Sequence, residues 1–379
     1  MKKVFAILMV VAMMATMFVG CGEKGSDDVL KIGSIGPLTG GAAVYGQAVK
    51  AGMEIAVEEI NAGDGLKIEL NFLDDEHDPE KSVNQYNKLK DWGMQVLGGT
   101  VTTDPCKAVA AECVADRMFL LTPSASDPSI PTLGDNIFQI CFTDTNQGTA
   151  SAELIAEKAL GTNIGVIYDT SSAYSAGIYE TFKAVAEEKN MNVVCVETFT
   201  DANKSDLTTQ VTKCQEAGAD LVFLPFYATE AAQVLTYANK IGYAPIFFGC
   251  DGMDGILEVE NFDSKLAEGL IMLTPFAADA DDTATKSFVA KYQEKTGVIP
   301  NQFAADGYDV IYAIYYAAVA AGIDGSTSPE TACAELMAQF TNMTFDGLTG
   351  TGIEFAEDGT VAKAPTAVVV KDGAYMGIG

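Results

Sequence analysis

From residue 29 onward the sequence alternates short apolar segments with longer amphipathic ones, and this alternation constrains the fold more than any other feature. The segments 29–36 (VLKIGSIG) and 66–74 (LKIELNFLD) have the length and composition of strands. Between them, Gly46 to Asn61 carries apolar residues at helical spacing. Strands separated by helices form parallel sheets that are covered on both faces. This region therefore predicts an α/β unit.

The same series restarts after Asp144. Four further strands are expected at NIGVIYD, MNVVCVETF, ADLVFLPF and APIFFGCD, with helices at about Tyr174–Lys189, Ser205–Ala217 and Thr229–Ile241. Two such series predict two Rossmann-like lobes with parallel sheets, joined by a multi-strand hinge. We expect residues 28–143 and 275–350 in lobe 1, and residues 144–274 and 351–379 in lobe 2.

The first 21 residues have the three-part pattern of a secretory signal. Lys2 and Lys3 precede an apolar run from Val4 to Val19, which is followed by Cys21. That run is shorter than the roughly 20 residues that span a bilayer, although a permanent signal anchor remains an alternative. The ending FVGC resembles the lipobox of bacterial lipoproteins. We therefore expect an extracytoplasmic protein that is held at the cell membrane by lipid on Cys21.

Charge and motifs exclude several function classes. The chain has 23 Lys and Arg against 52 Asp and Glu, a net charge of −29 that repels nucleic acid. It has one histidine, His77, and it has neither a phosphate-loop Lys nor a GxSxG or HExxH motif. We therefore expect that the protein is not an enzyme and that it binds neither a cofactor nor a metal ion. Asp74–Asp78 could hold a cation, but a solvated loop with Asp78-Pro79 starting a helix is favoured.

Seven cysteines follow Cys21, and an odd number leaves at least one thiol outside any bridge within the chain. Cys106 and Cys113 are seven positions apart on an expected helix, about 10 Å along its axis, which is too far for a disulfide. Cys195 with Cys214 is a possible bridge. Otherwise the sparse spacing favours buried, unpaired thiols.

Polar and aromatic residues follow several of the expected strands. In open α/β sheets, ligands bind beyond the carboxyl ends of the strands. The residues collected at these ends include Thr102, Ser124, Ala125, Ser126, Tyr174, Tyr227 and Asp251. Hydroxyls and helix N-terminal amides bind a carboxylate, and an acid binds an ammonium group. The set therefore predicts a site for a zwitterion, although each Ser or Thr could be a simple helix cap.

These positions lie within blocks that carry a family resemblance. The blocks are KIGSIGPLTGGAAVYGQAVKAGMEIAVEEINAGDG, LDDEHDPEKS, LLTPSASDP, YDTSSAYSAG, FYATEAAQ and FFGCDG. In this order and spacing the chain resembles the leucine/isoleucine/valine-binding proteins of the type I periplasmic-binding-protein family, which feed ABC importers. Family members often have a cysteine where this chain has His77 and another near Val101, so the resemblance implies that the family disulfide is missing.

The resemblance also implies a role for each site residue. The ligand carboxylate would meet Thr102 and Ser126, and the ammonium would meet Asp251 and the backbone carbonyl of Ser124, next to Ala125. Three aromatic rings would line the pocket, namely Tyr45, Tyr174 and Tyr227. Asp251 is one carbon shorter than the glutamate often found there, which affects reach and specificity.

The expected function is capture of a branched-chain or other small apolar amino acid by closure of the two lobes. The protein would act as a monomer and deliver its ligand to ABC permease subunits in the membrane. Alternatives are a binder of amides, urea or another small carboxylate, and a sensory ligand-binding protein.

Overall fold

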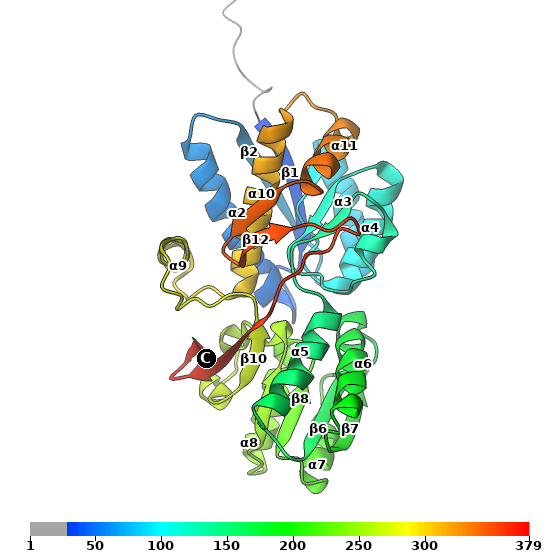
Figure 1. Cartoon of the computed structure of the whole chain (residues 1–379), viewed down its shortest axis with the longest axis vertical. Helices are drawn as coiled ribbons and strands as arrows, with labels where there is room; N and C mark the ends of the chain where they lie inside the picture. The colour runs from blue at the N-terminus through cyan, green and yellow to red at the C-terminus, as the bar shows by residue number, and fades with distance from the viewer. Residues whose placement is uncertain (1–28, 379) are drawn as a thin grey trace, which may run out of the picture.

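The computed structural model describes residues 29–378 and shows two α/β lobes stacked along the long axis of the molecule (Figure 1). The first lobe contains a parallel five-stranded sheet in the order β2-β1-β3-β4-β5. Its strands are β1 (Val29–Gly36), β2 (Lys67–Asp74), β3 (Val96–Leu97), β4 (Leu120–Thr122) and β5 (Ile137–Gln139). Its helices are α2 (Ala43–Ala62), α3 (Pro79–Trp92), α4 (Thr103–Asp116), α9 (Thr283–Thr296), α10 (Gln302–Ala321) and α11 (Pro329–Phe340).

The second lobe contains a seven-stranded sheet in the order β14-β13-β10-β9-β8-β6-β7. Its strands are β6 (Ile164–Asp169), β7 (Val193–Phe199), β8 (Leu221–Leu224), β9 (Ile246–Gly249), β10 (Ile271–Thr274), β13 (Thr366–Lys371) and β14 (Ala374–Gly377). Its helices are α5 (Asp144–Glu157), α6 (Ala173–Glu188), α7 (Thr208–Glu216) and α8 (Ala228–Lys240). Strands β6 to β10 pair in parallel, whereas β13 and β14 add an antiparallel edge.

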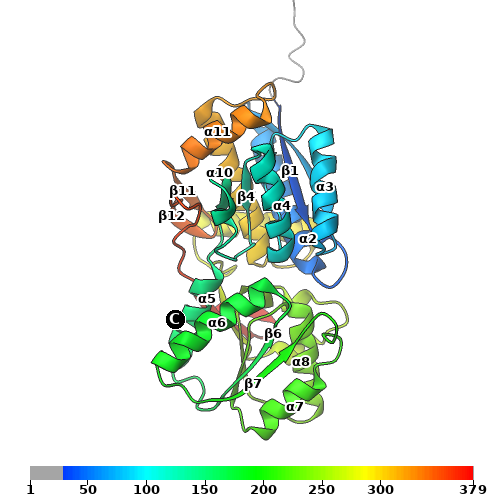
Figure 2. The same ribbon diagram turned by 90° about the vertical axis from the view of Figure 1, so that its right-hand side faces the viewer.

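The chain crosses between the lobes where β5 leads to α5 (Figure 2), and again where β10 leads to α9 and where β12 leads to β13 (Figure 1). We expected the last return to the second lobe at residue 351, and the structure places it later. Strand β12 (Gly350–Glu354) pairs with β11 (Thr344–Gly347), and Gly359 O accepts a hydrogen bond from Gln139 N of β5. The Phe355 ring packs on Phe340, which holds this segment on the first lobe.

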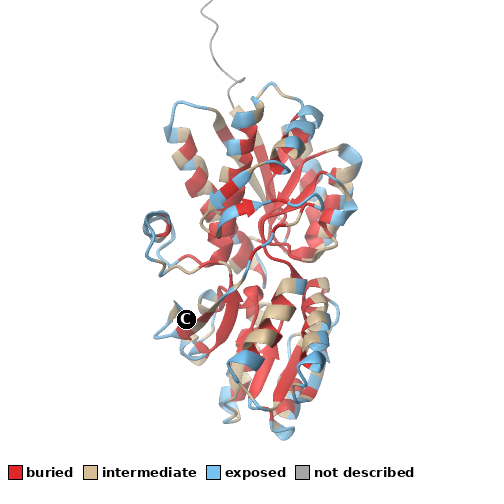
Figure 3. Cartoon of the chain, viewed as in Figure 1, coloured by how far each residue is buried: buried red, intermediate tan, exposed pale blue. Residues whose placement is uncertain are grey.

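The core of each lobe lies between its sheet and its helices (Figure 3). In the first lobe, α2 and α10 cross with their backbones in contact. A Cβ added at Gly52 would lie 1.9 Å from Ala304 O, and one at Gly307 would lie 2.4 Å from Val49 O. Only glycine allows this approach, and it fixes α10 against the helix that carries Tyr45.

The elements that the sequence predicted are present with shifted ends, whereas β5, α5, α11 and β11 were not predicted. Helix α2 begins three residues earlier than expected and α7 begins at Thr208. Helix α11 was missed, although Ser328 caps it through a hydrogen bond from Thr331 N and Pro329 opens it. The expected signal segment and Cys21 lie outside the described residues. Within residues 29–378, no helix is long and apolar enough to cross a membrane.

Candidate ligand site between the lobes

Thr102 lies at the start of α4, where the first-lobe sheet ends. Its backbone is extended, with φ −104° and ψ 152°, and its hydroxyl makes no cap to the helix. Instead Thr102 Oγ1 lies 2.9 Å from Nδ1 of His77. The hydroxyl is therefore free of the capping role that strand-end Thr residues commonly have, and a histidine ring holds it in place.

The loop after β4 carries Ser124, Ala125 and Ser126. Ser124 Oγ donates to Val101 O at 2.7 Å, and Ala125 N donates to Thr122 Oγ1 at 3.0 Å. These bonds fix the loop on the first lobe. Ser126 is 1% exposed, and its hydroxyl has no hydrogen-bond partner. A buried polar group without a partner costs about 1–3 kcal/mol, so an anionic group placed beside Ser126 would relieve that cost.

Asp251 follows β9 on the second lobe and is 2% exposed. Tyr174 OH donates to Asp251 Oδ1 at 2.6 Å, and Asp251 N donates to Gln147 Oε1 at 3.1 Å. Burial raises the pKa of the Asp251 carboxyl to about 6, although the hydrogen bonds from its neighbours lower it. A buried carboxylate with a raised pKa is stabilised by a cation, so this position suits an ammonium group.

Aromatic rings connect the acid to the first lobe. Tyr174 and Tyr227 stack with centroids 5.0 Å apart and an interplanar angle of 5°. Tyr227 in turn lies 5.2 Å from the Tyr45 ring and 5.4 Å from the His77 ring, centroid to centroid. The structure thus brings the three expected tyrosines together, with His77 and Thr102 at one end of the row and Asp251 at the other.

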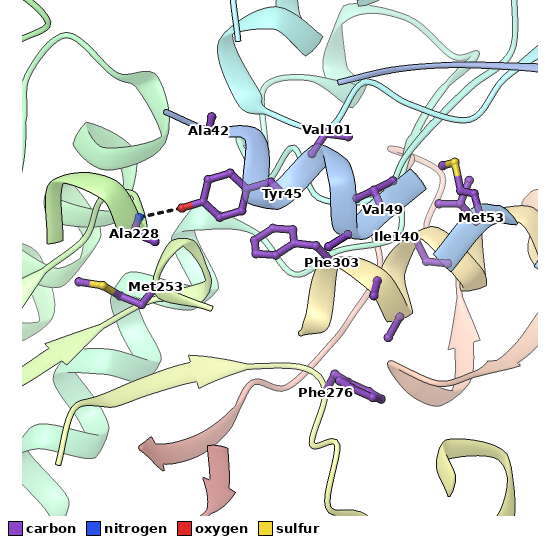
Figure 4. Packing of buried hydrophobic residues seen from close by; sticks show 14 of the residues in the cluster. Ala42, Tyr45, Val49, Met53, Val101, Ile140, Ala228, Met253, Phe276 and Phe303 are labelled. Atoms are coloured by element: carbon purple, nitrogen blue, oxygen red, sulfur yellow. Dashed lines mark hydrogen bonds between the residues drawn. The ribbon is translucent and has the colours of Figure 1, made fainter. Parts of the chain in front are cut away.

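The Tyr45 hydroxyl bridges the lobes directly. It accepts from Ala228 N at 2.7 Å (Figure 4) and donates to Gly252 O at 2.6 Å, and both partners belong to the second lobe. Nearby, Thr229 Oγ1 donates to Gly41 O at 2.6 Å. Tyr45 was expected only as a wall of the pocket. The structure shows that its hydroxyl also forms hydrogen bonds between the two lobes.

A cavity of about 320 Å³ lies between the lobes and shares His77 and Tyr227 with the site. Its lining also carries acidic side chains from both lobes, namely Glu76, Asp104, Asp169, Asp201 and Glu230, together with Lys204. Burial raises the pKa of Asp104 and of Glu230. This cavity is therefore acidic, like the chain as a whole, and Thr102, Ser126 and Asp251 do not line it.

Sequence reasoning missed Asp144 and Gln147, which lie in the first turn of α5. Asp144 is 1% exposed, and its N donates to Ser126 O at 2.9 Å. Burial raises the pKa of its carboxyl well above the ordinary value, and the nearby Ser126 hydroxyl lowers it. Both residues follow a strand, as the other candidates do, so the rule applied to the other strands would have found them.

The acidic loop after β2 is less solvated than expected. Asp75 is fully buried, its Oδ2 accepts from Ser82 Oγ at 2.8 Å, and burial raises its pKa to about 6. His77 lies between the lobes, and burial lowers its pKa, so the ring is neutral. Asp78 caps α3 through Lys81 N at 2.8 Å, as predicted. Across residues 29–378, no group of three or more His, Cys, Asp or Glu is placed to hold a metal ion.

Two α/β lobes closed over a buried polar site define the class of two-lobed ligand-binding proteins. The sequence matches the family described as periplasmic binding protein over residues 29–374. The chain therefore belongs to the periplasmic-binding-protein family, a family of solute-binding proteins that act outside the cytoplasm, as its resemblance indicated. The predicted α/β fold class is confirmed by this match and by solved structures.

Individual relatives cover nearly the whole chain. Leu/Ile/Val-binding protein homolog 3 of Brucella melitensis is 27% identical over 355 residues, which is 92% of this chain and 93% of the relative. A leucine-, isoleucine-, valine-, threonine- and alanine-binding protein of Pseudomonas aeruginosa is 28% identical over 88% of this chain and 87% of its own length. The crystal structure of a leucine-binding protein from Thermotoga maritima superposes with a TM-score of 0.81, at 25% identity, over 92% of this chain and 98% of that one.

Proposed function

We propose that this protein is the extracytoplasmic solute-binding component of an ABC importer and captures an α-amino acid by lobe closure. Two observations support the proposal: the second lobe holds a buried acid beside stacked tyrosines, and the first lobe holds a buried hydroxyl without a hydrogen-bond partner. No cationic side chain acts on the Asp251 carboxyl of the second lobe, and the Ser126 hydroxyl of the first lobe has no partner at hydrogen-bond distance. A zwitterion supplies both at once.

In this proposal the carboxylate is bound by Ser126 and Thr102, and the ammonium by Asp251 and the carbonyl of Ser124. His77 holds Thr102 Oγ1 at 2.9 Å. When Nδ1 carries the proton, it donates to Thr102, and the Thr102 hydroxyl can then donate to the ligand. The site is enclosed by the rings of Tyr45, Tyr174 and Tyr227, with Ala125 in its wall. These side chains exclude water, which strengthens the interactions with both the carboxylate and the ammonium group.

The names of the relatives support a small aliphatic amino acid as the ligand. We further propose that lipid on Cys21 holds the protein at the membrane, where a monomer delivers the ligand to permease subunits. Binding and release, rather than catalysis, is the proposed activity. Transport requires release, so an affinity near 1 μM, about 8 kcal/mol, is expected.

Titration calorimetry of the protein with the twenty amino acids tests the proposal. The same titrations use the matching amides and the matching carboxylic acids that lack the amino group. We expect heat from one or a few aliphatic amino acids and none from their deaminated analogues, because those leave Asp251 unpaired. Equal binding of a deaminated analogue would contradict the ammonium role of Asp251. Binding of an amide in place of the acid would move the protein to the class of amide binders.

A further inference from the structure

A pair of thiols lies in contact in the second lobe, away from the ligand site. Cys195 belongs to strand β7 and Cys214 to helix α7, and their sulfur atoms are 3.3 Å apart. We propose that Cys195 and Cys214 form a disulfide bond that fastens α7 to β7 in the mature protein.

The local fold directs the two side chains toward each other. Strand β7 is the edge of the seven-stranded sheet, and α7 follows it in the chain and packs back against it. Cys195 is on the covered side of the strand, whereas its neighbour Val196 is 41% exposed. Gly165 of the adjacent strand β6 leaves room for the pair, since a Cβ there would lie 3.2 Å from Cys214 Sγ. A disulfide needs a sulfur–sulfur distance of about 2 Å, so a small side-chain movement suffices.

The other cysteines of the described chain have different surroundings. Cys141 Sγ donates to Ala125 O, Cys250 Sγ lies 3.6 Å from Ser151 Oγ, and Cys333 Sγ lies 3.8 Å from Met337 Sδ. Among residues 29–378, Cys195 and Cys214 are the cysteines whose sulfur atoms lie in contact with each other. These remaining thiols are expected to stay reduced.

The compartment supplies the oxidant. Disulfides form and persist outside the cytoplasm, where this family acts. The oxidant required is a disulfide donor, either a small molecule or a protein. The Cys195 thiolate attacks the donor, one donor thiol leaves, and a mixed disulfide forms. The Cys214 thiolate then attacks Cys195 Sγ and releases the second donor thiol. The two cysteines lose two protons and two electrons, and the donor disulfide is reduced to two thiols.

Access and acidity set which sulfur reacts first. Cys195 is 9% exposed and lies on an edge strand, whereas Cys214 is fully buried. Burial raises the pKa of both thiols, so little thiolate is present at neutral pH and the uncatalysed reaction is slow. The donor therefore reaches Cys195, and Cys214 completes the bond.

Peptide mapping tests the bond directly. The purified protein is incubated with oxidised glutathione or with dithiothreitol, and free thiols are then blocked with N-ethylmaleimide under denaturing conditions. Trypsin cuts after Lys189, Lys204, Lys213 and Lys240, so the two cysteines fall in separate peptides, 190–204 and 214–240. We expect the two peptides to be linked by a disulfide in the oxidised sample. In the reduced sample they should be separate, each with one N-ethylmaleimide group on its cysteine. Two blocked peptides in the oxidised sample would overturn the proposal.

Thermal unfolding gives a second readout. Closing the loop between residues 195 and 214 restricts the unfolded chain, so the oxidised protein should unfold roughly 5 °C above the reduced one. Cys195→Ser should abolish this difference, whereas Cys333→Ala, which removes another buried thiol, should retain it. A difference that persists in Cys195→Ser would show that the bond does not cause it and would contradict the proposal.

Discussion

The two ends of the candidate site are built on opposite principles. On the first lobe, Thr102 and Ser126 offer neutral donors, and the loop that carries Ser126 is fixed by bonds within that lobe. On the second lobe, Asp251 offers a charge, held by Tyr174 and enclosed by stacked rings. The Ser126 hydroxyl at the neutral end has no acceptor, whereas the Asp251 carboxyl at the acidic end has no cation. The two ends therefore require ligand groups of opposite charge.

This difference explains why the closed site selects a dipolar ligand. A chain with a net charge of −29 and a single arginine has few cations to spare for a ligand carboxylate. Neutral hydroxyls bind that group without bringing a permanent charge into the core. At the other end a full negative charge is needed, because burying an ammonium without a partner is costly. The acidic end should therefore carry the larger share of the binding free energy.

The largest expected effect comes from Asp251→Asn. Loss of the buried charge partner should weaken amino-acid binding by roughly 100-fold or more. The unliganded variant should be more stable than the wild type at pH 7, because burial of the Asp251 charge costs up to about 3 kcal/mol when its pKa rises from 3.8 to about 6. Calorimetry measures the first effect and thermal unfolding the second.

Asp251→Glu is the matched control, since it retains the charge and adds one carbon. It should retain binding with a changed preference among amino acids. If Asp251→Asn bound the ligand as tightly as the wild type, the acidic end would not hold the ammonium group and the comparison of the two ends would be wrong.

The neutral end should respond less. Ser126→Ala removes one donor to the ligand carboxylate, and a hydrogen bond to a charged group is worth about 1.5–3 kcal/mol, so we expect affinity to fall roughly 30-fold. The unliganded protein should lose little stability, because the Ser126 hydroxyl lies near the Asp144 carboxyl but has no partner at hydrogen-bond distance there. Thermal unfolding with and without ligand measures both quantities. Ser124→Ala is the contrasting variant, which should destabilise the unliganded protein because it loses the bond to Val101 O.

The arrangement of the lobes and most strand positions could be predicted because apolar segments and helical spacing repeat along the chain. The location of Thr102, Ser126 and Asp251 followed from the rule on strand ends. Two features could not be read from the sequence. The bridging role of the Tyr45 hydroxyl depends on Gly252 O and Ala228 N, which are backbone atoms without a sequence signature. The position of His77 depends on a turn in which Glu76 and His77 both have positive φ.

The charge asymmetry also predicts a dependence on pH. Because the pKa of Asp251 is about 6 in the unliganded protein, lowering the pH from 7 to 5 protonates it before the ligand arrives. Affinity should fall about tenfold over that range. Binding at pH 6 should release protons, because the ammonium favours the ionised carboxyl. Calorimetry at pH 6 in buffers of different ionisation enthalpy measures the release.

The unliganded protein should change in the opposite direction. Below about pH 3, Asp251 is protonated in both the folded and the unfolded state. As the pH rises towards 6, the unfolded chain loses this proton while the folded chain keeps it, so the contribution of Asp251 to stability falls. Asp251→Asn should lack this part of the pH dependence. An affinity that stays constant from pH 5 to 7 would mean that Asp251 remains ionised throughout.

The smallest effect on ligand affinity is expected for the Tyr45 hydroxyl, which joins the two lobes and belongs to neither end of the site. Tyr45→Phe retains the ring contacts with Tyr227 and Phe303 but removes the bonds to Gly252 O and Ala228 N. Both backbone groups can bind water when the lobes open, so closure becomes less favourable by about 1 kcal/mol and affinity should fall roughly fivefold, chiefly through faster release.

Tyr86→Phe is the matched control for that variant, because Tyr86 is also buried in the first lobe and its hydroxyl donates to Asp116 Oδ2 at 3.0 Å, away from the other lobe. It should lower stability without changing ligand release. Small-angle scattering of the unliganded Tyr45→Phe protein should show a larger radius of gyration than the wild type. If release stays unchanged while the Asp251 and Ser126 variants behave as expected, the ligand itself, rather than the Tyr45 hydroxyl, closes the lobes.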